Sequence, residues 1–295
     1  MKSKKHIKHA VLISASIFLT VILASCTIGA SRGNRSPSEN AVNLEVVEPE
    51  AQQTIEVPTT EPILNIPDYI TIRGEQFSTD LTELFLDGAL TNEDLVPLRY
   101  MTNLESLWLG GAAGSSGEFT DLSPIAGLTN LRDLSLDSIY LSDLSPLAGL
   151  TNLTMIQAWG SQIADLTPLA GLDNLDLLAI MGNHITDLSP ISELASLTVL
   201  DLSFGQITDI TPLAGLTNLR RLNLERNQIT DISPLASLAN AGRSELEDLN
   251  LRENQISDIS PLAYLVSLRD LWIPGNPITD LSHVAHVEHV WSDIE

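Results

Sequence analysis

The residue types that catalysis needs are scarce in this sequence of 295 residues. Cys26 is the single cysteine, and His184 is the only histidine within the regular part of the chain, where we expect it in a turn. Asp133 and Asp137 form a carboxylate pair, but on an open sheet nothing would make one an acid and the other a base. No glycine-rich loop opens a long helix to hold a phosphate. The sequence therefore predicts a protein that is not an enzyme and needs no cofactor.

Aspartates recur at regular spacing and could suggest a ladder of calcium sites. Each stands before a buried Ile or Leu and a Ser/Thr-Pro or Ser-His pair: Asp121, Asp143, Asp165, Asp187, Asp209, Asp231, Asp258 and Asp280. The spacing lacks the clustered oxygen ligands of a calcium loop. A carboxylate in such a turn more simply accepts hydrogen bonds from nearby backbone N–H groups, and this is the role that we expect.

A histidine cluster near the end of the sequence allows a metal-binding alternative. His283, His286 and His289 stand three residues apart, with Glu288 beside them. On a helix this spacing drifts by about 60 degrees at each step, so two of the three could bind a transition metal together more easily than all three. We favour a solvent-exposed terminal helix without a metal, since Val284, Val287, Val290 and Trp291 also recur at helical spacing.

A repeat of about 22 residues organises most of the chain and must position these groups. One apolar position recurs with six of its eight intervals at 22 or 23 residues and the other two at 27: Leu84, Leu107, Leu134, Ile156, Leu178, Leu200, Leu222, Leu249 and Leu271. Insertions at 110–118 and about 239–243 account for the two long intervals. A repeat of this length cannot bury an apolar face alone, so neighbouring repeats must stack.

The stretch from Leu219 to Leu238 shows what one repeat should form. Its apolar residues alternate around Leu222 and Leu224 and are then spaced more widely, which predicts a short strand, a turn and a compact helical segment. An asparagine stands at the turn as Asn227 and again as Asn183, Asn254 and Asn276, whereas Ala89, Ile139, Ser161 and Gly205 replace it elsewhere. The Ser/Thr-Pro pairs predict a helix N-cap followed by proline at the first helical position.

This pattern, LxxLxLxxNxIxDISPLAxL, resembles the leucine-rich repeat of the internalin type, which is found on bacterial surfaces. The resemblance covers about nine repeats over 81–281. It implies an α/β solenoid, a right-handed superhelix with a parallel sheet on the concave face and short 3-10 or α turns on the convex face, and a role in protein binding. A parallel β-helix is the alternative, but a single strand signal per repeat disfavours it.

The residues that flank the inward leucines of each strand should point outward from the concave sheet. Large apolar residues gather at these positions in the first two thirds of the repeats, whereas the last third is mostly charged. The candidate binding residues are Phe85, Trp108, Met155, Gln157, Trp159, Leu177, Met181 and Val199. A protein partner is the favoured ligand and a glycan or cell-wall ligand the alternative. An aromatic ladder that stabilises adjacent strands is the structural alternative.

The N-terminal segment 1–25 has the layout of a secretion signal, with four lysines before an apolar run from Ala10 to Ala24. The sequence Leu23-Ala24-Ser25-Cys26 resembles a lipobox, which implies lipidation of Cys26, for example by palmitate, and a lipid-anchored protein outside the bacterial cytoplasmic membrane. Residues 26–65 predict a disordered tether, 66–80 an N-terminal cap and 282–295 a C-terminal cap.

Removal of the signal would leave 11 arginines against 38 acidic residues, a net charge of −27. So acidic a chain is not expected to bind nucleic acid or an anionic lipid surface, and we expect a monomer held to the membrane only by its lipid.

Overall fold

The structure is a computed structural model that describes residues 66–110, 117–138, 140–239 and 244–294. The predicted signal, Cys26, the tether and parts of both insertions lie outside these ranges. No helix in the described ranges is long and apolar enough to span a membrane.

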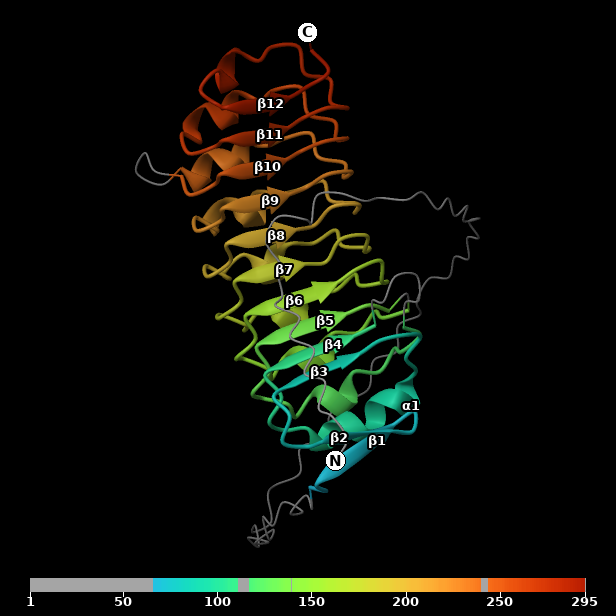
Figure 1. The fold of residues 1–295 in the computed structure, drawn as a ribbon. Helices are drawn as coiled ribbons and strands as arrows, with labels where there is room; N and C mark the ends of the chain where they lie inside the picture. The colour runs from blue at the N-terminus through green and yellow to red at the C-terminus, as the bar shows by residue number, and fades with distance from the viewer. Residues whose placement is uncertain (1–65, 111–116, 139, 240–243, 295) are drawn as a thin grey trace, which may run out of the picture. The chain divides into compact units, whose positions relative to one another are not determined.

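Ten parallel strands form one sheet with the order β12-β11-β10-β9-β8-β7-β6-β5-β4-β3 (Figure 1). Their bounds are Glu83–Leu86 (β3), Ser106–Leu109 (β4), Asp133–Leu136 (β5), Met155–Ala158 (β6), Leu177–Ala179 (β7), Val199–Asp201 (β8), Arg221–Asn223 (β9), Asp248–Asn250 (β10), Asp270–Trp272 (β11) and His289–Trp291 (β12). The register aligns Leu84, Leu107 and Leu134, and the alignment continues repeat by repeat to Leu271. Sequence spacing therefore predicted the pairing of the nine strands β3 to β11 correctly.

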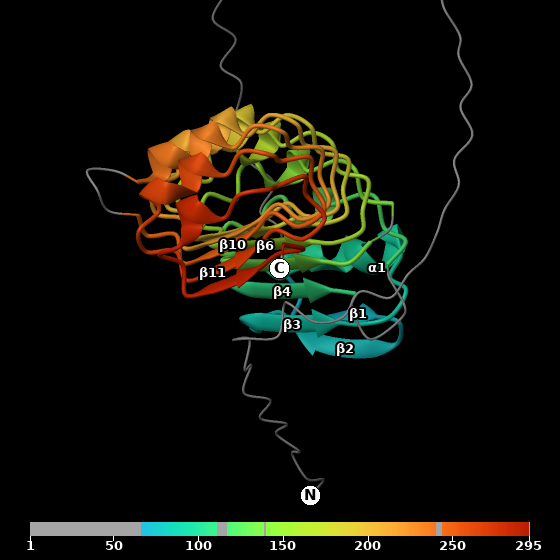
Figure 2. The ribbon, with the colours of Figure 1, turned by 90° about the horizontal axis from the view of Figure 1, so that it is seen from above.

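Short 3-10 helices lie on the side opposite the sheet (Figure 2). They span Val96–Tyr100 (η1), Ser123–Ile125 (η2), Ser145–Leu147 (η3), Thr167–Leu169 (η4), Ser189–Ile191 (η5), Thr211–Gly215 (η6), Ser233–Leu238 (η7), Ser260–Tyr264 (η8) and Ser282–Val284 (η9); a single α-helical turn, Asn92–Leu95 (α1), precedes η1. This arrangement is that of a leucine-rich-repeat solenoid.

The predicted N-cap role of Ser or Thr is wrong. Ser233 begins η7 as a helical residue after Ile232 at the N-cap position, and its hydroxyl donates to the carboxylate of Asp231 at 3.0 Å. The same carboxylate accepts a hydrogen bond from the backbone N–H of Ser233 at 2.7 Å. The aspartate thus supplies the acceptor for a donor that the first turn leaves unpaired, and it stands two residues before the position that we assigned.

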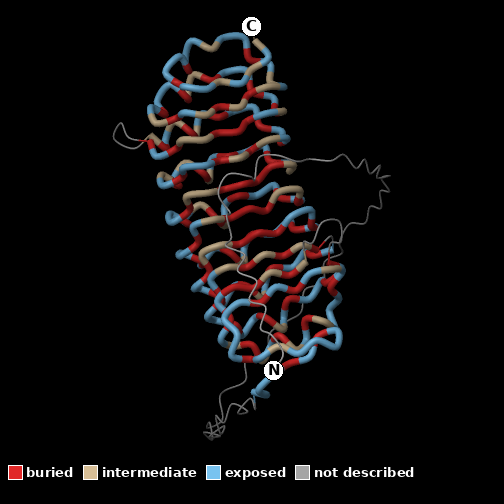
Figure 3. Tube along the Cα trace, in the orientation of Figure 1, coloured by how far each residue is buried: buried red, intermediate tan, exposed pale blue. Residues whose placement is uncertain are grey.

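The core lies between the sheet and the 3-10 helices and runs through successive repeats (Figure 3). All seven apolar residues of the stretch that defined the repeat are buried with at most 2 % of their surface exposed: Leu219, Leu222, Leu224, Ile229, Ile232, Leu235 and Leu238. Phe119, which follows the first insertion, is fully buried as well. Each repeat therefore buries its aliphatic residues against those of its neighbours, as the spacing predicts.

Asparagines in four of the turns join their repeat to the preceding one, and three of them, Asn183, Asn227 and Asn254, are buried. The Nδ2 group of Asn227 donates to the carbonyl oxygens of Leu224 at 3.1 Å and Leu202 at 3.0 Å. Its Oδ1 atom accepts from the backbone N–H of Ile207 at 3.0 Å. Asn183, Asn254 and Asn276 make the corresponding bonds. The predicted role of these residues in the turns is confirmed, and the bonds between repeats extend it.

Smaller residues continue this connection where asparagine is missing. The hydroxyl of Ser161 donates to the carbonyl of Ser138 at 2.5 Å, and that of Ser138 donates to the carbonyl of Phe119 at 2.6 Å. A Cβ atom on Gly205 would approach Oδ1 of Asn227 to 2.8 Å. The glycine therefore leaves the space that the asparagine of the next repeat occupies.

The two ends of the described chain differ from one another. The segment 66–80, where we expected an N-terminal cap, holds an antiparallel hairpin of Tyr69–Ile72 (β1) and Glu75–Ser78 (β2), and Ile70 and Ile72 of this hairpin join the core. The terminal helix that we predicted is wrong: after η9 the chain forms β12, and Val290 pairs with Leu271. The spacing of Val284, Val287 and Val290 fits a further repeat as well as it fits a helix, so periodicity alone did not decide between them.

Replacing Asn227 by alanine should lower the free energy of unfolding by about 3 kcal/mol, because buried backbone groups in two repeats lose their partner. Chemical denaturation followed by circular dichroism measures this loss. The exposed neighbour Gln228, changed to alanine, is the control and should stay within about 0.5 kcal/mol of the parent. Equal stability of the two variants would contradict this role for the asparagine.

Candidate functional site

The side of the sheet that points away from the 3-10 helices, the sheet face, carries three rows of side chains. Each strand contributes one residue before the aligned leucine position, one after it and a third two residues later. In β3 these are Glu83, Phe85 and Asp87, which define the first, middle and third rows. In-register pairing places equivalent residues of neighbouring strands side by side. The sheet face is therefore a rigid surface whose composition changes along the stack.

An aromatic pair stands at the β3 end of the middle row. The rings of Phe85 and Trp108 stack in parallel, with centroids 4.0 Å apart and planes 1° apart. Phe85 remains 58 % exposed, whereas Trp108 is half-buried. The pair is thus an aromatic ladder between two strands, as our structural alternative proposed, and it also presents a large apolar surface to solvent.

A second apolar area lies across β6, β7 and β8. Met155, Leu177 and Val199 are consecutive partners in the first row, and each is half-buried. Trp159 and Met181 stand in the third row of β6 and β7, and Trp159 is 44 % exposed. These five predicted residues therefore lie in the first and third rows of the sheet face, over the neighbouring strands β6, β7 and β8.

Gln157, which we predicted to be an exposed binding residue, is buried, with only 7 % of its surface exposed. It stands in the middle row of β6 between the first-row and third-row side chains. Ala179 and Asp201, its successors in this row, are likewise 4 % and 7 % exposed. The middle row is therefore buried at β6, β7 and β8, although its residues alternate with the inward core residues. Alternation along one strand predicts the direction of a side chain but not its exposure. The prediction of an accessible Gln157 is wrong.

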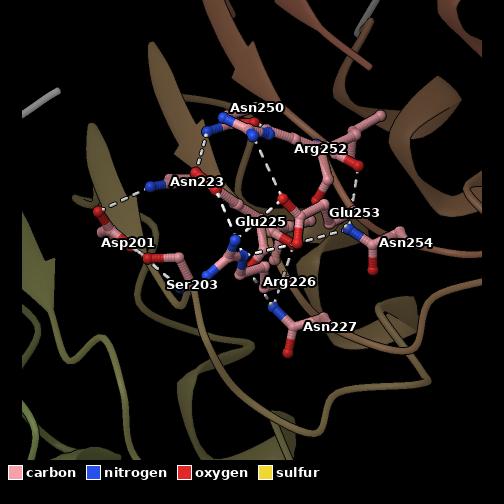
Figure 4. A network of polar contacts seen from close by, with 12 residues as sticks. Asp201, Ser203, Asn223, Glu225, Arg226, Asn227, Asn250, Arg252, Glu253 and Asn254 are labelled. Atoms are coloured by element: carbon pink, nitrogen blue, oxygen red, sulfur yellow. Dashed lines mark hydrogen bonds and ion pairs between the residues drawn. The ribbon is translucent and has the colours of Figure 1, made fainter. Parts of the chain in front are cut away.

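The C-terminal third of the sheet face is charged and holds an ion pair between neighbouring strands. Arg221 lies 2.9 Å from Asp248 in the next strand, measured between Nε and Oδ2. Burial raises the pKa of Asp248, and the adjacent Asp270 carboxyl raises it further, while Arg221 opposes both. Figure 4 shows the polar network beside these residues, in which Asn223 donates to Asp201 at 2.9 Å.

Three consecutive repeats hold a side-chain ladder at the turn that follows the strand. Phe204, Arg226 and Glu253 all have positive φ angles, between 53° and 59°, a conformation that residues other than glycine rarely adopt. The guanidinium of Arg226 lies 5.0 Å from the centre of the Phe204 ring. It donates to both carboxylate oxygens of Glu253, at 2.6 and 3.1 Å (Figure 4). The three residues with positive φ are therefore also the residues whose side chains contact one another between repeats.

Sequence reasoning missed a second aromatic pair. Trp272 and Trp291 stack with centroids 4.5 Å apart at the other end of the sheet. Trp272 holds the middle-row position of β11, whereas we expected Trp291 in a terminal helix. The equivalence of the pairs Leu271-Trp272 and Val290-Trp291 was the signal that could have revealed this stack.

The three C-terminal histidines do not gather on one helix face, as the metal-binding alternative required. His283 lies in η9, Nε2 of His286 lies 3.1 Å from the carbonyl oxygen of Leu265, and Nδ1 of His289 lies 2.9 Å from Oδ1 of Asp270. Across the residues that the structure describes, no group of three or more His, Cys, Asp or Glu side chains is placed to hold a metal ion. The separation follows from the turn and strand that replace the expected helix.

The recurring aspartates serve the local role that we expected. Each accepts a hydrogen bond from the backbone N–H two residues later, at 2.7 to 2.8 Å. Hydrogen bonds from the backbone N–H and the hydroxyl of this Ser or Thr hold the pKa of seven aspartates below its ordinary value of 3.8: Asp121, Asp143, Asp165, Asp187, Asp209, Asp258 and Asp280. The recurring aspartates therefore stabilise the turns.

Comparisons with known proteins agree with this architecture. The family described as "Leucine Rich repeats (2 copies)" matches residues 195–237 and 244–286. An internalin C2 of Listeria monocytogenes is 30 % identical, with the match covering 74 % of this chain and 85 % of that one at a TM-score of 0.53. The chain belongs to the internalin-type leucine-rich-repeat proteins.

Another internalin of Listeria monocytogenes, inlF, is 29 % identical, and the match covers 75 % of this internalin-type chain and 78 % of that one at a TM-score of 0.56. The leucine-rich-repeat ectodomain of the plant membrane receptor kinase GASSHO1/SCHENGEN3 of Arabidopsis thaliana shares the fold. It is 17 % identical, with 73 % of this chain and 30 % of that one covered at a TM-score of 0.59. None of the curated proteins compared with the chain matches it.

The free energy of unfolding should fall in acid because the recurring aspartates become protonated. A folded-state pKa below the unfolded value means that the unfolded chain binds more protons, so this stabilisation is complete above about pH 5 and is lost as pH falls through the folded-state pKa values. Changing Asp143, Asp165 and Asp187 to asparagine keeps a hydrogen-bond acceptor but removes the titration. We expect a shallower fall in the free energy of unfolding between pH 5 and pH 3, measured by denaturant titration.

The matched control changes Glu75, Glu93 and Glu193 to glutamine, which alters the net charge equally but leaves the recurring aspartates in place. This control should retain the slope of the parent protein. A slope for the aspartate variant as steep as that of the parent would contradict the assignment.

Proposed function

We propose that the chain is a non-catalytic surface protein that binds a protein partner through its sheet face. The contact residues in this proposal are Phe85, Trp108, Met155, Trp159, Leu177, Met181 and Val199. The observation that carries the proposal is the exposure of Phe85 and Trp159, at 58 % and 44 %, on a sheet whose other side is fully occupied by the core. Large exposed apolar side chains on a rigid surface are typical of sites that a partner covers.

The rigidity of the face favours tight binding. Backbone hydrogen bonds between strands and the asparagine bonds between repeats fix the strands before a partner arrives. Binding would therefore cost little additional backbone entropy, and the stacked ring of Trp108 is already ordered. The plant ectodomain with the same fold was solved in complex with Casparian strip integrity factor 2, an example of such a solenoid with a bound partner.

The second part of the proposal is lipid anchoring outside the cell. Cys26 follows an apolar run of signal-peptide length and ends a lipobox-like sequence, so we propose that it is lipidated and becomes the membrane attachment of the mature chain. Residues 27–65 would then hold the repeats away from the membrane. An extracytoplasmic position agrees with membership of the internalin-type proteins.

Changing Trp108 and Trp159 to alanine should abolish recovery of the partner, because the change removes the largest anchors of both apolar areas. The test is affinity purification with the full-length chain from its native envelope, with captured proteins quantified by mass spectrometry. Changing Trp272 to alanine removes a ring from the other end of the same sheet and is the matched control. Retention of the partner by the double variant, with an unchanged melting temperature, would refute the assigned patch.

Changing Cys26 to serine should eliminate incorporation of radiolabelled palmitate and move the chain from the membrane fraction to the soluble fraction. Changing the adjacent Ser25 to alanine keeps a small residue before the cysteine and should leave both measurements unaltered. Persistent label on the Cys26 variant would show that the anchor lies elsewhere.

A further inference from the structure

Carboxylates flank the Phe85–Trp108 pair on both sides. Glu83 and Asp133 stand in the first row, and Asp87 and Asp137 in the third. The middle row between them holds the two stacked rings. Asp133 is oriented by hydrogen bonds from the hydroxyls of Ser106 at 3.0 Å and Thr154 at 3.3 Å. The β3–β5 part of the sheet face thus combines aromatic surface with negative charge.

No basic side chain occupies a row position on β3, β4, β5 or β6. Arg132 precedes β5, and its Nε atom lies 3.9 Å from the carboxylate of Glu105, which also precedes a strand rather than standing in a row. At the opposite end of the sheet the pattern differs, because Arg221 pairs with Asp248 and Arg226 with Glu253. Arginines therefore stand beside carboxylates in this part of the chain, whereas no ion pair among the described residues involves Glu83, Asp87, Asp133 or Asp137.

We infer that the β3–β5 part of the sheet face binds a cationic protein segment, one that presents arginine or lysine side chains to the aromatic pair. This inference rests on the proposed function and specifies the chemistry of its partner. A guanidinium group is attracted to the face of an aromatic ring and to carboxylates at the same time. The exposed Phe85 ring, with Glu83 in its own strand and Asp87 directly after that strand, offers both interactions.

Charge complementarity also disfavours two other occupants. A second copy of the chain would bring a formal net charge of −23 against an acidic surface. The segment 27–65 of the same chain is acidic too, with six glutamates and two arginines: Glu39, Glu45, Glu48, Glu50, Glu56, Glu61, Arg32 and Arg35. A separate, positively charged protein segment is the occupant that the surface fits.

The test titrates the full-length chain with a synthetic nonapeptide that alternates arginine with threonine, and with a twin in which citrulline replaces each arginine. Citrulline keeps the shape of the side chain but carries no charge. Isothermal calorimetry at low salt should give a Kd at least about tenfold lower for the arginine peptide, and this preference should shrink at high salt. Equal affinity for the two peptides would overturn the inference.

Two charge variants locate the effect. Glu83→Gln, Asp87→Asn, Asp133→Asn and Asp137→Asn together should raise the Kd for the arginine peptide by at least about tenfold. The control, Glu75→Gln, Glu93→Gln, Asp173→Asn and Glu193→Gln, changes the net charge equally at positions outside the rows and should stay within about twofold. Equal losses in both variants would indicate attraction by net charge alone and overturn the inference.

The result can be separated from that for the proposed function. If the native partner is captured through Trp108 and Trp159 but the arginine peptide shows no preference, the sheet face binds a partner of another chemistry and only this inference fails. If the double tryptophan variant retains the partner, the proposed function fails as well.

Discussion

Burial of aliphatic side chains between neighbouring repeats is the constraint on which the rest of this structure depends. A single repeat has one strand and one short 3-10 segment, and its leucines have no cover within the repeat itself. Only the adjacent repeats supply that cover. The chain must therefore stack in register, and the stack requires every strand to lie parallel to the next. The exposed side of the sheet is a by-product of this packing, since the core uses only the other side.

Polar groups then fix the stack that the leucines favour. Asn183, Asn227 and Asn254 join successive turns, and the aspartates accept the N–H groups at which the 3-10 segments begin. These bonds use side chains that are charged or polar without leaving them available for chemistry. In the C-terminal third, Arg221 on the sheet face pairs with Asp248 of the following strand, and Arg226 at the turn pairs with Glu253 of the following turn. The carboxylates near Phe85 differ from these, because no ion pair among the described residues involves them.

The sequence allowed the register of nine strands to be predicted because the leucine positions recur at fixed spacing, and one repeat calibrates all the others. The spacing did not decide which of two suitable residues or conformations is used at a given position. Asp231 rather than Ser233 provides the acceptor at the start of η7, since both residues can cap a helix and only geometry selects between them. The segment after Asp280 has valines that suit a helix or a repeat, and packing against β11 decides for the repeat. For the sheet face, outward direction was predictable but exposure was not: Gln157 points outward and is nevertheless enclosed by its neighbours.

The in-register pairing of the strands gives the sheet face a fixed unit of length. Neighbouring strands in a sheet lie about 4.8 Å apart, so equivalent side chains on successive repeats can be separated only by multiples of this step. Met155 and Val199 stand in the first row on β6 and β8, two steps apart along the stack. Gain or loss of one whole repeat would change such a separation by one step while preserving the direction of every side chain. The number of repeats therefore sets the distance between equivalent side chains on the sheet face. Evolution can change this distance by adding or removing whole repeats, without new contacts inside a repeat.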